Sequence, residues 1–265
     1  MLKKVIKYFL PYGIIVLHRQ YNDYLKYTKK YQNIQKSFIF DIILSVGVAC
    51  RPAHYLKKHD LRFCANPLDW MMAYSLDTVI HLYKTKFNDF FADFVEDKQK
   101  SLEENCSWYI DNRNGIISMH YKDVESNNRL FRDKMKYRFE KINSILLSAN
   151  KICFISNRIE NTDVYKNFLE KMAEIYSGNI TYINIKNNNN ISTDYPVKRS
   201  EEKMSDKLKL IEYEFNDIHP QGGDLKTNNA AWLGNYAIWD NIMKGISVKK
   251  VDFLSYLLFR IKNAD

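Results

Sequence analysis

Residues 151–185 constrain the fold more than any other part of this 265-residue chain. Residues 151–156 and 180–185 are short apolar runs rich in β-branched residues, which is typical of buried strands. Between them, Thr162 is expected to cap a helix that runs to Tyr176, with Gly178 just past its end. A strand, a helix and a second strand at this spacing form a right-handed parallel unit. The sequence therefore predicts an α/β fold, a single domain with a mostly parallel sheet and flanking helices.

Further elements follow from the same patterns. Strands are expected at residues 38–44 and 208–215, helices at 51–58, 127–149 and 232–244, a hairpin with the loop 111–115, and a long loop over 187–205. Strands 38–44, 151–156 and 180–185 are expected to share one sheet. Its carboxyl edge would then carry Cys50 and Arg158, at the place where open α/β sheets bind ligands.

Positive charge divides the chain into two parts. Residues 1–36 contain eight Lys or Arg and one Asp, and so carry +7 of the net charge of +9. The remainder is nearly neutral and offers no broad basic surface for phosphates, so we do not expect nucleic acid as a partner. We therefore predict a basic aromatic N-terminal arm, residues 1–36, and an α/β catalytic domain, residues 37–265.

The arm is amphipathic as well as basic. Its apolar stretch is interrupted by Pro11 and Gly13 and is shorter than the roughly 20 residues that a spanning helix needs. Lys residues among apolar and Tyr side chains suit a segment that lies on an anionic membrane surface. The alternative is an ordinary amphipathic helix that packs on the body. The first alternative predicts a cytoplasmic protein that is peripheral at the inner face of the membrane.

The four cysteines, at positions 50, 64, 106 and 153, include no C-x-x-C pair. Neither a zinc site nor a disulfide framework is expected, and reduced thiols in a cytoplasm are the simpler interpretation. The chain also lacks a G-x-G-x-x-G motif, a Walker loop and a D-x-D motif. The sequence thus predicts no cofactor and no metal.

Cys50 is the first candidate for chemistry. It closes the turn at residues 45–50, after an apolar strand and before the helix that begins near Pro52. At a helix N-terminus the unpaired N–H groups and the helix dipole favour a thiolate, so Cys50 is expected to be the most reactive of the four thiols. The alternative is a buried structural cysteine.

A cysteine nucleophile needs a base within hydrogen-bond reach, and histidine is the usual one. Among six histidines, His120 ends the second strand of the predicted hairpin, where a rigid element can present it to a cleft. Asp123, Asp69 or Asp240 would orient it, and the sequence leaves the choice open. A histidine with only a structural role is the alternative.

Several motifs resemble, in order, those of a bacterial family known as the putative papain-like cysteine peptidases. They are Ser45-Val46-Gly47-Val48-Ala49-Cys50, Pro67-Leu68-Asp69-Trp70, Phe87-Asn88-Asp89-Phe90-Phe91, the strand end with His120, Ser156-Asn157-Arg158, Trp232-Leu233-Gly234 and Trp239-Asp240. The resemblance implies thiol chemistry. The glutamine that papain-like enzymes carry shortly before the cysteine is missing, so backbone N–H groups of the Cys50 helix are the expected oxyanion donors.

Three functions remain open. The first is a thiol-dependent hydrolase or acyl transferase, with Cys50 as nucleophile and His120 as base, acting in bacterial surface-glycan metabolism on a small-molecule or glycan substrate. The second is a nucleotide-sugar transferase of surface-polysaccharide biosynthesis that uses no covalent cysteine. The third is a non-catalytic binding protein. The candidate substrate contacts are Asp69, Trp70, Arg158, Trp232 and Asp240.

Overall fold

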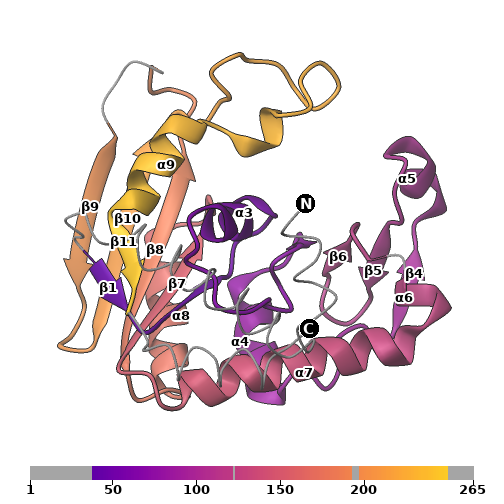
Figure 1. Ribbon diagram of the computed structural model, residues 1–265, viewed down its shortest axis with the longest axis horizontal. Helices are drawn as coiled ribbons and strands as arrows, with labels where there is room; N and C mark the ends of the chain where they lie inside the picture. Colours follow the sequence, from indigo (N-terminus) through magenta and orange to yellow (C-terminus); the bar gives the residue numbers. More distant parts are fainter. Residues whose placement is uncertain (1–37, 122, 193–196, 250–265) are drawn as a thin grey trace, which may run out of the picture.

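Parallel strands form the centre of the fold, as the sequence predicts. The computed structural model describes residues 38–121, 123–192 and 197–249 (Figure 1). Its largest sheet has the order β2 (Ile42–Ser45), β7 (Lys151–Ser156), β8 (Asn179–Asn187), β10 (Leu208–Phe215) and β9 (Lys198–Lys203). The first four strands are parallel, and β9 is antiparallel to β10. The predicted α/β class is therefore confirmed.

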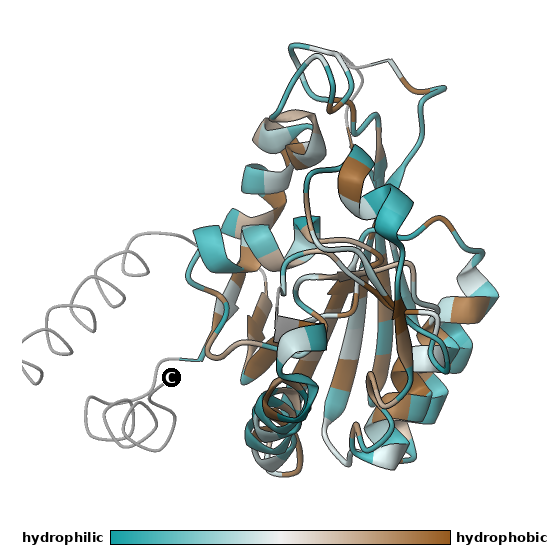
Figure 2. Cartoon of the chain, turned by 90° about the vertical axis from the view of Figure 1, so that its right-hand side faces the viewer, coloured by the Kyte–Doolittle hydropathy of each residue, from teal (hydrophilic) through white to brown (hydrophobic). Residues whose placement is uncertain are grey.

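Both faces of this sheet are covered by helices. Successive residues of a strand point to opposite faces, and β7 places Ile152 and Phe154 in one hydrophobic cluster and Cys153 and Ile155 in another. The first cluster is closed by α4 (Leu76–Thr85), α7 (Asn128–Leu146) and α8 (Thr162–Ala173), and the second by α3 (Arg51–Lys58) and α9 (Tyr236–Lys244). Hydrophobic residues accordingly lie on the central strands, and hydrophilic ones line the outer faces of the helices (Figure 2).

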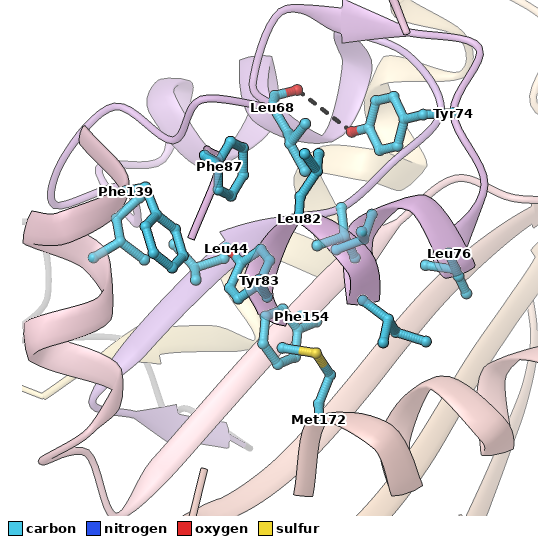
Figure 3. Close-up of a cluster of buried hydrophobic side chains, with 14 of the residues drawn as sticks. Leu44, Leu68, Tyr74, Leu76, Leu82, Tyr83, Phe87, Phe139, Phe154 and Met172 are labelled. Atoms are coloured by element: carbon cyan, nitrogen blue, oxygen red, sulfur yellow. Dashed lines mark hydrogen bonds between the residues drawn. The ribbon is translucent and has the colours of Figure 1, made fainter. Parts of the chain in front are cut away.

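The larger cluster anchors the segment that leads to the candidate site. Phe154 of β7 packs edge-on to Tyr83 of α4, with ring centroids 6.2 Å apart (Figure 3). Leu68 and Tyr74 bring the loop after α3 into the same core, and the Tyr74 hydroxyl donates to the Leu68 carbonyl at 3.4 Å. Burial of each such side chain contributes about 1.5–3 kcal/mol, so this loop is fixed by packing.

The strand predicted over residues 38–44 is divided at Asp41. Its first part, β1 (Phe38–Phe40), pairs with β11 (Ile246–Val248) in a separate two-stranded sheet. The Asp41 carboxylate accepts the N–H groups of Asn150 and Lys151 at 2.8 and 2.9 Å, which turns the chain between the two parts. The prediction that residues 38–44 form one strand of the main sheet is therefore wrong for its first half.

A small antiparallel sheet was not predicted as a whole. Its order is β3 (Met71–Met72), β6 (Ile117–Ser118), β5 (Tyr109–Asp111) and β4 (Phe94–Glu96), followed in space by the short helices α5 (Lys98–Glu103) and α6 (Asp123–Ser126). The expected hairpin is confirmed, because β5 and β6 pair around residues 111–116. His120 lies two residues beyond β6.

Three other boundaries differ from the predictions. The loop over 187–205 contains β9, whose residues are all exposed and therefore lack the alternation of a half-buried strand. The helix at 162 is capped by Asn161, whose side chain accepts the Asp163 N–H. The helix at 232–244 is interrupted at Gly234, between the 3₁₀ helix η1 (Ala231–Leu233) and α9, where φ is +64°.

The N-terminal arm, residues 1–36, lies outside the described residues, so its placement and the division into arm and body stay predictions. No helix in the described ranges combines the length and apolar character that crossing a bilayer requires.

Candidate active site

The turn between β2 and α3 is held in place on several sides. The N–H of Val46 continues the parallel pairing by donating to the Ile155 carbonyl at 2.9 Å. Gly47 fits because there is no room for a side chain: a Cβ there would lie 2.6 Å from Pro52 Cγ and 2.9 Å from Asn157 Oδ1. The turn therefore delivers Cys50 to the N-terminus of α3 in a fixed position.

Arg158 stabilises the same turn through hydrogen bonds. Its side chain is buried, and its guanidinium donates to the carbonyl oxygens of Val46 and Tyr74 at 3.1 and 2.7 Å and pairs with Glu160 at 2.7 Å. Cys50 and Arg158 thus both follow the carboxyl ends of adjacent parallel strands, as expected. The guanidinium is occupied by main-chain oxygens and is not part of the pocket lining.

The structure brings Cys50 and His120 together. Cys50 Sγ lies 3.3 Å from His120 Nε2, although 70 positions separate the two residues in the chain. Cys50 is half-buried, whereas His120 is exposed beyond the end of β6. The indole of Trp70 meets the His120 ring edge-on, with centroids 5.8 Å apart. A thiol within hydrogen-bond reach of an imidazole is the arrangement that nucleophilic cysteine chemistry requires.

The pair is neutral at rest. Burial raises the pKa of Cys50 to about 11, and the negative charge of Asp69 acts in the same direction. Partial desolvation of its ring lowers the pKa of His120 below its usual 6.5. Burial of the thiol thus opposes the thiolate that the helix N-terminus is expected to favour. Neutral His120 can still accept the Cys50 proton during attack.

The three candidate carboxylates occupy different places. The Asp123 side chain lies outside the described residues. Asp69 is fully buried and accepts from Arg62 Nη1 and the Asn66 N–H, both at 2.8 Å. Asp240 pairs with Lys58 and His59 at the far end of α3. Among described side chains, none makes a hydrogen bond with the remaining ring nitrogen of His120.

Asp69 has a structural effect that depends on pH. Burial raises its pKa from 3.8 to about 6, against the opposing effects of Arg62 and the Asn66 N–H. The native state therefore holds this proton more tightly than the unfolded chain. The resulting stabilisation is complete below pH 3.8 and is lost as the pH rises through 6, a change of about 3 kcal/mol.

We expect Asp69→Asn to remove this pH dependence. Between pH 4 and 7, the free energy of unfolding of the unsubstituted protein should fall by about 2 kcal/mol relative to that of the variant. Urea denaturation at a series of pH values measures the difference. Parallel stability curves for the two proteins would show that Asp69 titrates normally.

A pocket of about 620 Å³ opens beside Cys50. Its lining combines the Cys50 turn, the small sheet and two late loops: Ala49, Cys50, Arg51, Trp70, Met72, Met119, His120, Asn157, Asp224, Leu225, Ala231 and Trp232. Cys50, His120, Trp70 and Trp232 are thus brought together at one pocket, whereas Asp69, Arg158 and Asp240 do not line it. This size is within the range of small-molecule sites.

The segment after β10, residues 217–235, is held against α3 by side chains that were not among the predicted site residues. Arg51 Nε donates to the Trp232 carbonyl at 2.6 Å, and Arg51 Nη1 pairs with Asp217. The Tyr55 hydroxyl donates to the Leu233 carbonyl at 3.0 Å. Asp217 lies two residues past β10, at the carboxyl edge of the sheet, where α/β proteins bind ligands. That position was the feature of the sequence that could have indicated its place near the site.

Asn157 was part of the Ser156-Asn157-Arg158 motif but was not predicted to be a site residue. It directly follows β7 and lines the pocket, and within the described part of the chain its Oδ1 atom is buried without a hydrogen-bond partner. A buried amide without a partner is uncommon in native proteins and often marks a functional position. In the described ranges no group of three or more His, Cys, Asp or Glu side chains is placed to hold a metal ion.

A cysteine at the start of a helix, paired with a histidine at a pocket of an α/β domain, defines a candidate cysteine-dependent hydrolase. The chain belongs to the family described as "Putative papain-like cysteine peptidase (DUF1796)", whose model matches residues 41–188. The match includes Cys50, Asp69, Trp70, His120 and Arg158, and ends before the motifs at 232–240.

One curated relative resembles part of the chain. It is "Uncharacterized protein R408" of Acanthamoeba polyphaga mimivirus, which is 22% identical over 154 aligned residues; the match covers 51% of this chain and 69% of the relative. No solved structure matches the chain.

Proposed function

We propose that this protein is a thiol-dependent hydrolase or acyl transferase in which Cys50 is the nucleophile and His120 the general base. The observation that carries the proposal is the 3.3 Å separation of Cys50 Sγ and His120 Nε2 at the pocket. The family description supports a thiol hydrolase in general terms.

The neutral pair defines the order of proton transfers. As Cys50 Sγ attacks an acyl carbon, its proton passes to His120 Nε2, because this imidazole nitrogen lies within hydrogen-bond reach of the thiol. His120 then returns the proton to the leaving group. Water, or the hydroxyl of a glycan acceptor, releases the acyl group in the second half of the reaction. Asp123, three residues after His120, enters the proposal as the positioning carboxylate on its sequence position alone.

The negative charge on the attacked carbonyl oxygen needs donors. No side chain caps α3, so the N–H groups of Arg51 and Ala53 are available near Cys50, while Pro52 has none. We assign the Nδ2 group of Asn157 as an additional donor, since this side chain lines the pocket. Together they would replace the missing glutamine.

The other functions have less support at this pocket. A nucleotide sugar carries a diphosphate, and the Arg51 guanidinium in the lining is already paired with Asp217 and the Trp232 carbonyl. Action on surface glycans, a cytoplasmic location and attachment of residues 1–36 to an anionic membrane remain part of the proposal through sequence alone.

Trapping an acyl-enzyme tests the proposal. With p-nitrophenyl acetate and an acid quench, we expect peptide mass mapping to find the acetyl group on Cys50 at least about tenfold faster than on Cys64 or Cys106, because Cys50 has the His120 imidazole within hydrogen-bond reach. Cys50→Ala should abolish the release of p-nitrophenol above background. Equal labelling of Cys106 and Cys50 would refute a nucleophilic role for Cys50.

A further inference from the structure

The pocket beside Cys50 has apolar walls on two sides. Trp70, Met72 and Met119 come from the small sheet and its ends, and Leu225, Ala231 and Trp232 come from the late loops. Trp232 is held firmly, because its indole meets the His54 ring edge-on at 4.8 Å while its carbonyl accepts from Arg51. Met side chains, by contrast, adapt to the shape of a ligand.

Two charged side chains, Arg51 and Asp224, also line the pocket. The Arg51 guanidinium is engaged by Asp217 and by the Trp232 carbonyl. The Asp224 carboxylate accepts the N–H groups of Lys226 and Thr227, both at 3.0 Å, and so closes its own turn. Arg51 is thus already paired, and the negative charge of Asp224 would repel an anionic ligand. An uncharged, apolar group is therefore the one that this lining can bury without leaving a polar partner unsatisfied.

We infer that the pocket selects an apolar acyl group, presented to Cys50 as an ester or thioester. This inference rests on the proposed function. Cys50 Sγ forms a bond to the acyl carbon as its proton moves to His120, and the carbon–oxygen or carbon–sulfur bond of the substrate breaks. The leaving alcohol or thiol takes the proton from His120. Water or an acceptor hydroxyl then cleaves the Cys50 thioester and restores the thiol.

Acyl chain length is the variable that tests this inference. We compare p-nitrophenyl acetate, butyrate and hexanoate, which share one leaving group, and measure acylation of Cys50 by mass mapping, with Cys50→Ala as the background. Each buried methylene should raise the second-order rate constant about fourfold, so that hexanoate exceeds acetate by about 100-fold or more.

Leu225→Asp introduces a charge into one wall at a position that is 58% exposed, where it should not disturb folding. It should slow the hexanoate reaction about tenfold or more relative to the acetate reaction, since only the longer chain would then meet a carboxylate. Leu102→Asp, at an exposed position on α5, is the matched control and should change neither rate.

The outcomes separate the two proposals. A steep dependence on chain length that Leu225→Asp removes supports the inference. Acylation of Cys50 at equal rates by all three esters would overturn the inference and leave the proposed function in place. No acylation of Cys50 by any ester would overturn the proposed function and this inference with it.

Discussion

Replacing His120 with alanine is expected to slow acylation of Cys50 by about 100- to 10,000-fold, the usual contribution of a general base. The expectation follows from the neutral resting pair. With the pKa of Cys50 at about 11, very little thiolate exists at pH 7, so attack depends on the imidazole that lies 3.3 Å away. The rate of p-nitrophenyl ester cleavage in the first turnover measures the effect.

The pH dependence should change along with the rate. In the unsubstituted protein, acylation should fall only below the lowered pKa of His120, where the imidazole becomes protonated. In His120→Ala the remaining reaction needs the thiolate, so its rate should rise about tenfold per pH unit from pH 7 toward the pKa of about 11. His81→Ala is the matched control, because His81 is an exposed histidine paired with Asp89. A flat profile for His120→Ala would exclude the general-base role.

The central α/β unit could be predicted because its strands are apolar on both faces. Residues 151–156 form a strand with the predicted bounds, since a buried parallel strand leaves an apolar run in the sequence. Residues 208–215 also form the predicted strand, although Lys209, Glu212 and Glu214 interrupt its apolar residues. Strand β9 could not be found in this way. It lies at an edge, and its charged residues are all exposed, a pattern that protects an edge from pairing with other chains.

Contacts between residues that are far apart in the sequence could not be predicted, and this limited the prediction of the site. The positions of Cys50 and His120 at a turn and at a strand end were visible in the sequence, and the structure places them in contact. The partners of Asp240 and Arg158 were not visible, because they come from other segments: Lys58 and His59 for one, and the carbonyl oxygens of Val46 and Tyr74 for the other. Spacing along one segment carries no information about such contacts.

Asp217 connects residues 217–235 to α3 through one buried carboxylate. Its side chain is 2% exposed and accepts from the Asn235 N–H at 2.8 Å, from Trp239 Nε1 at 2.9 Å and from Arg51 Nη1. Gly234 allows this approach, because a Cβ there would overlap both Asp217 and Arg51. The Trp232 wall of the pocket therefore depends on a charged pair that is mostly removed from water.

We expect Asp217→Ala to lower the free energy of unfolding by about 3–5 kcal/mol, because it leaves the Arg51 charge and two buried N–H donors without a partner. Urea denaturation measures the loss. Asp206→Ala is the matched control, since Asp206 is 95% exposed and its ion pair with Lys203 should contribute at most about 1 kcal/mol. Asp217→Asn keeps the shape and one acceptor, and should fall between the two. If Asp217→Ala lowered the free energy of unfolding no more than Asp206→Ala, the Asp217 carboxylate would not hold residues 217–235 against α3. The position of Trp232 would then have to depend on the packing of Tyr55 and Trp239, whose rings stack with centroids 4.8 Å apart.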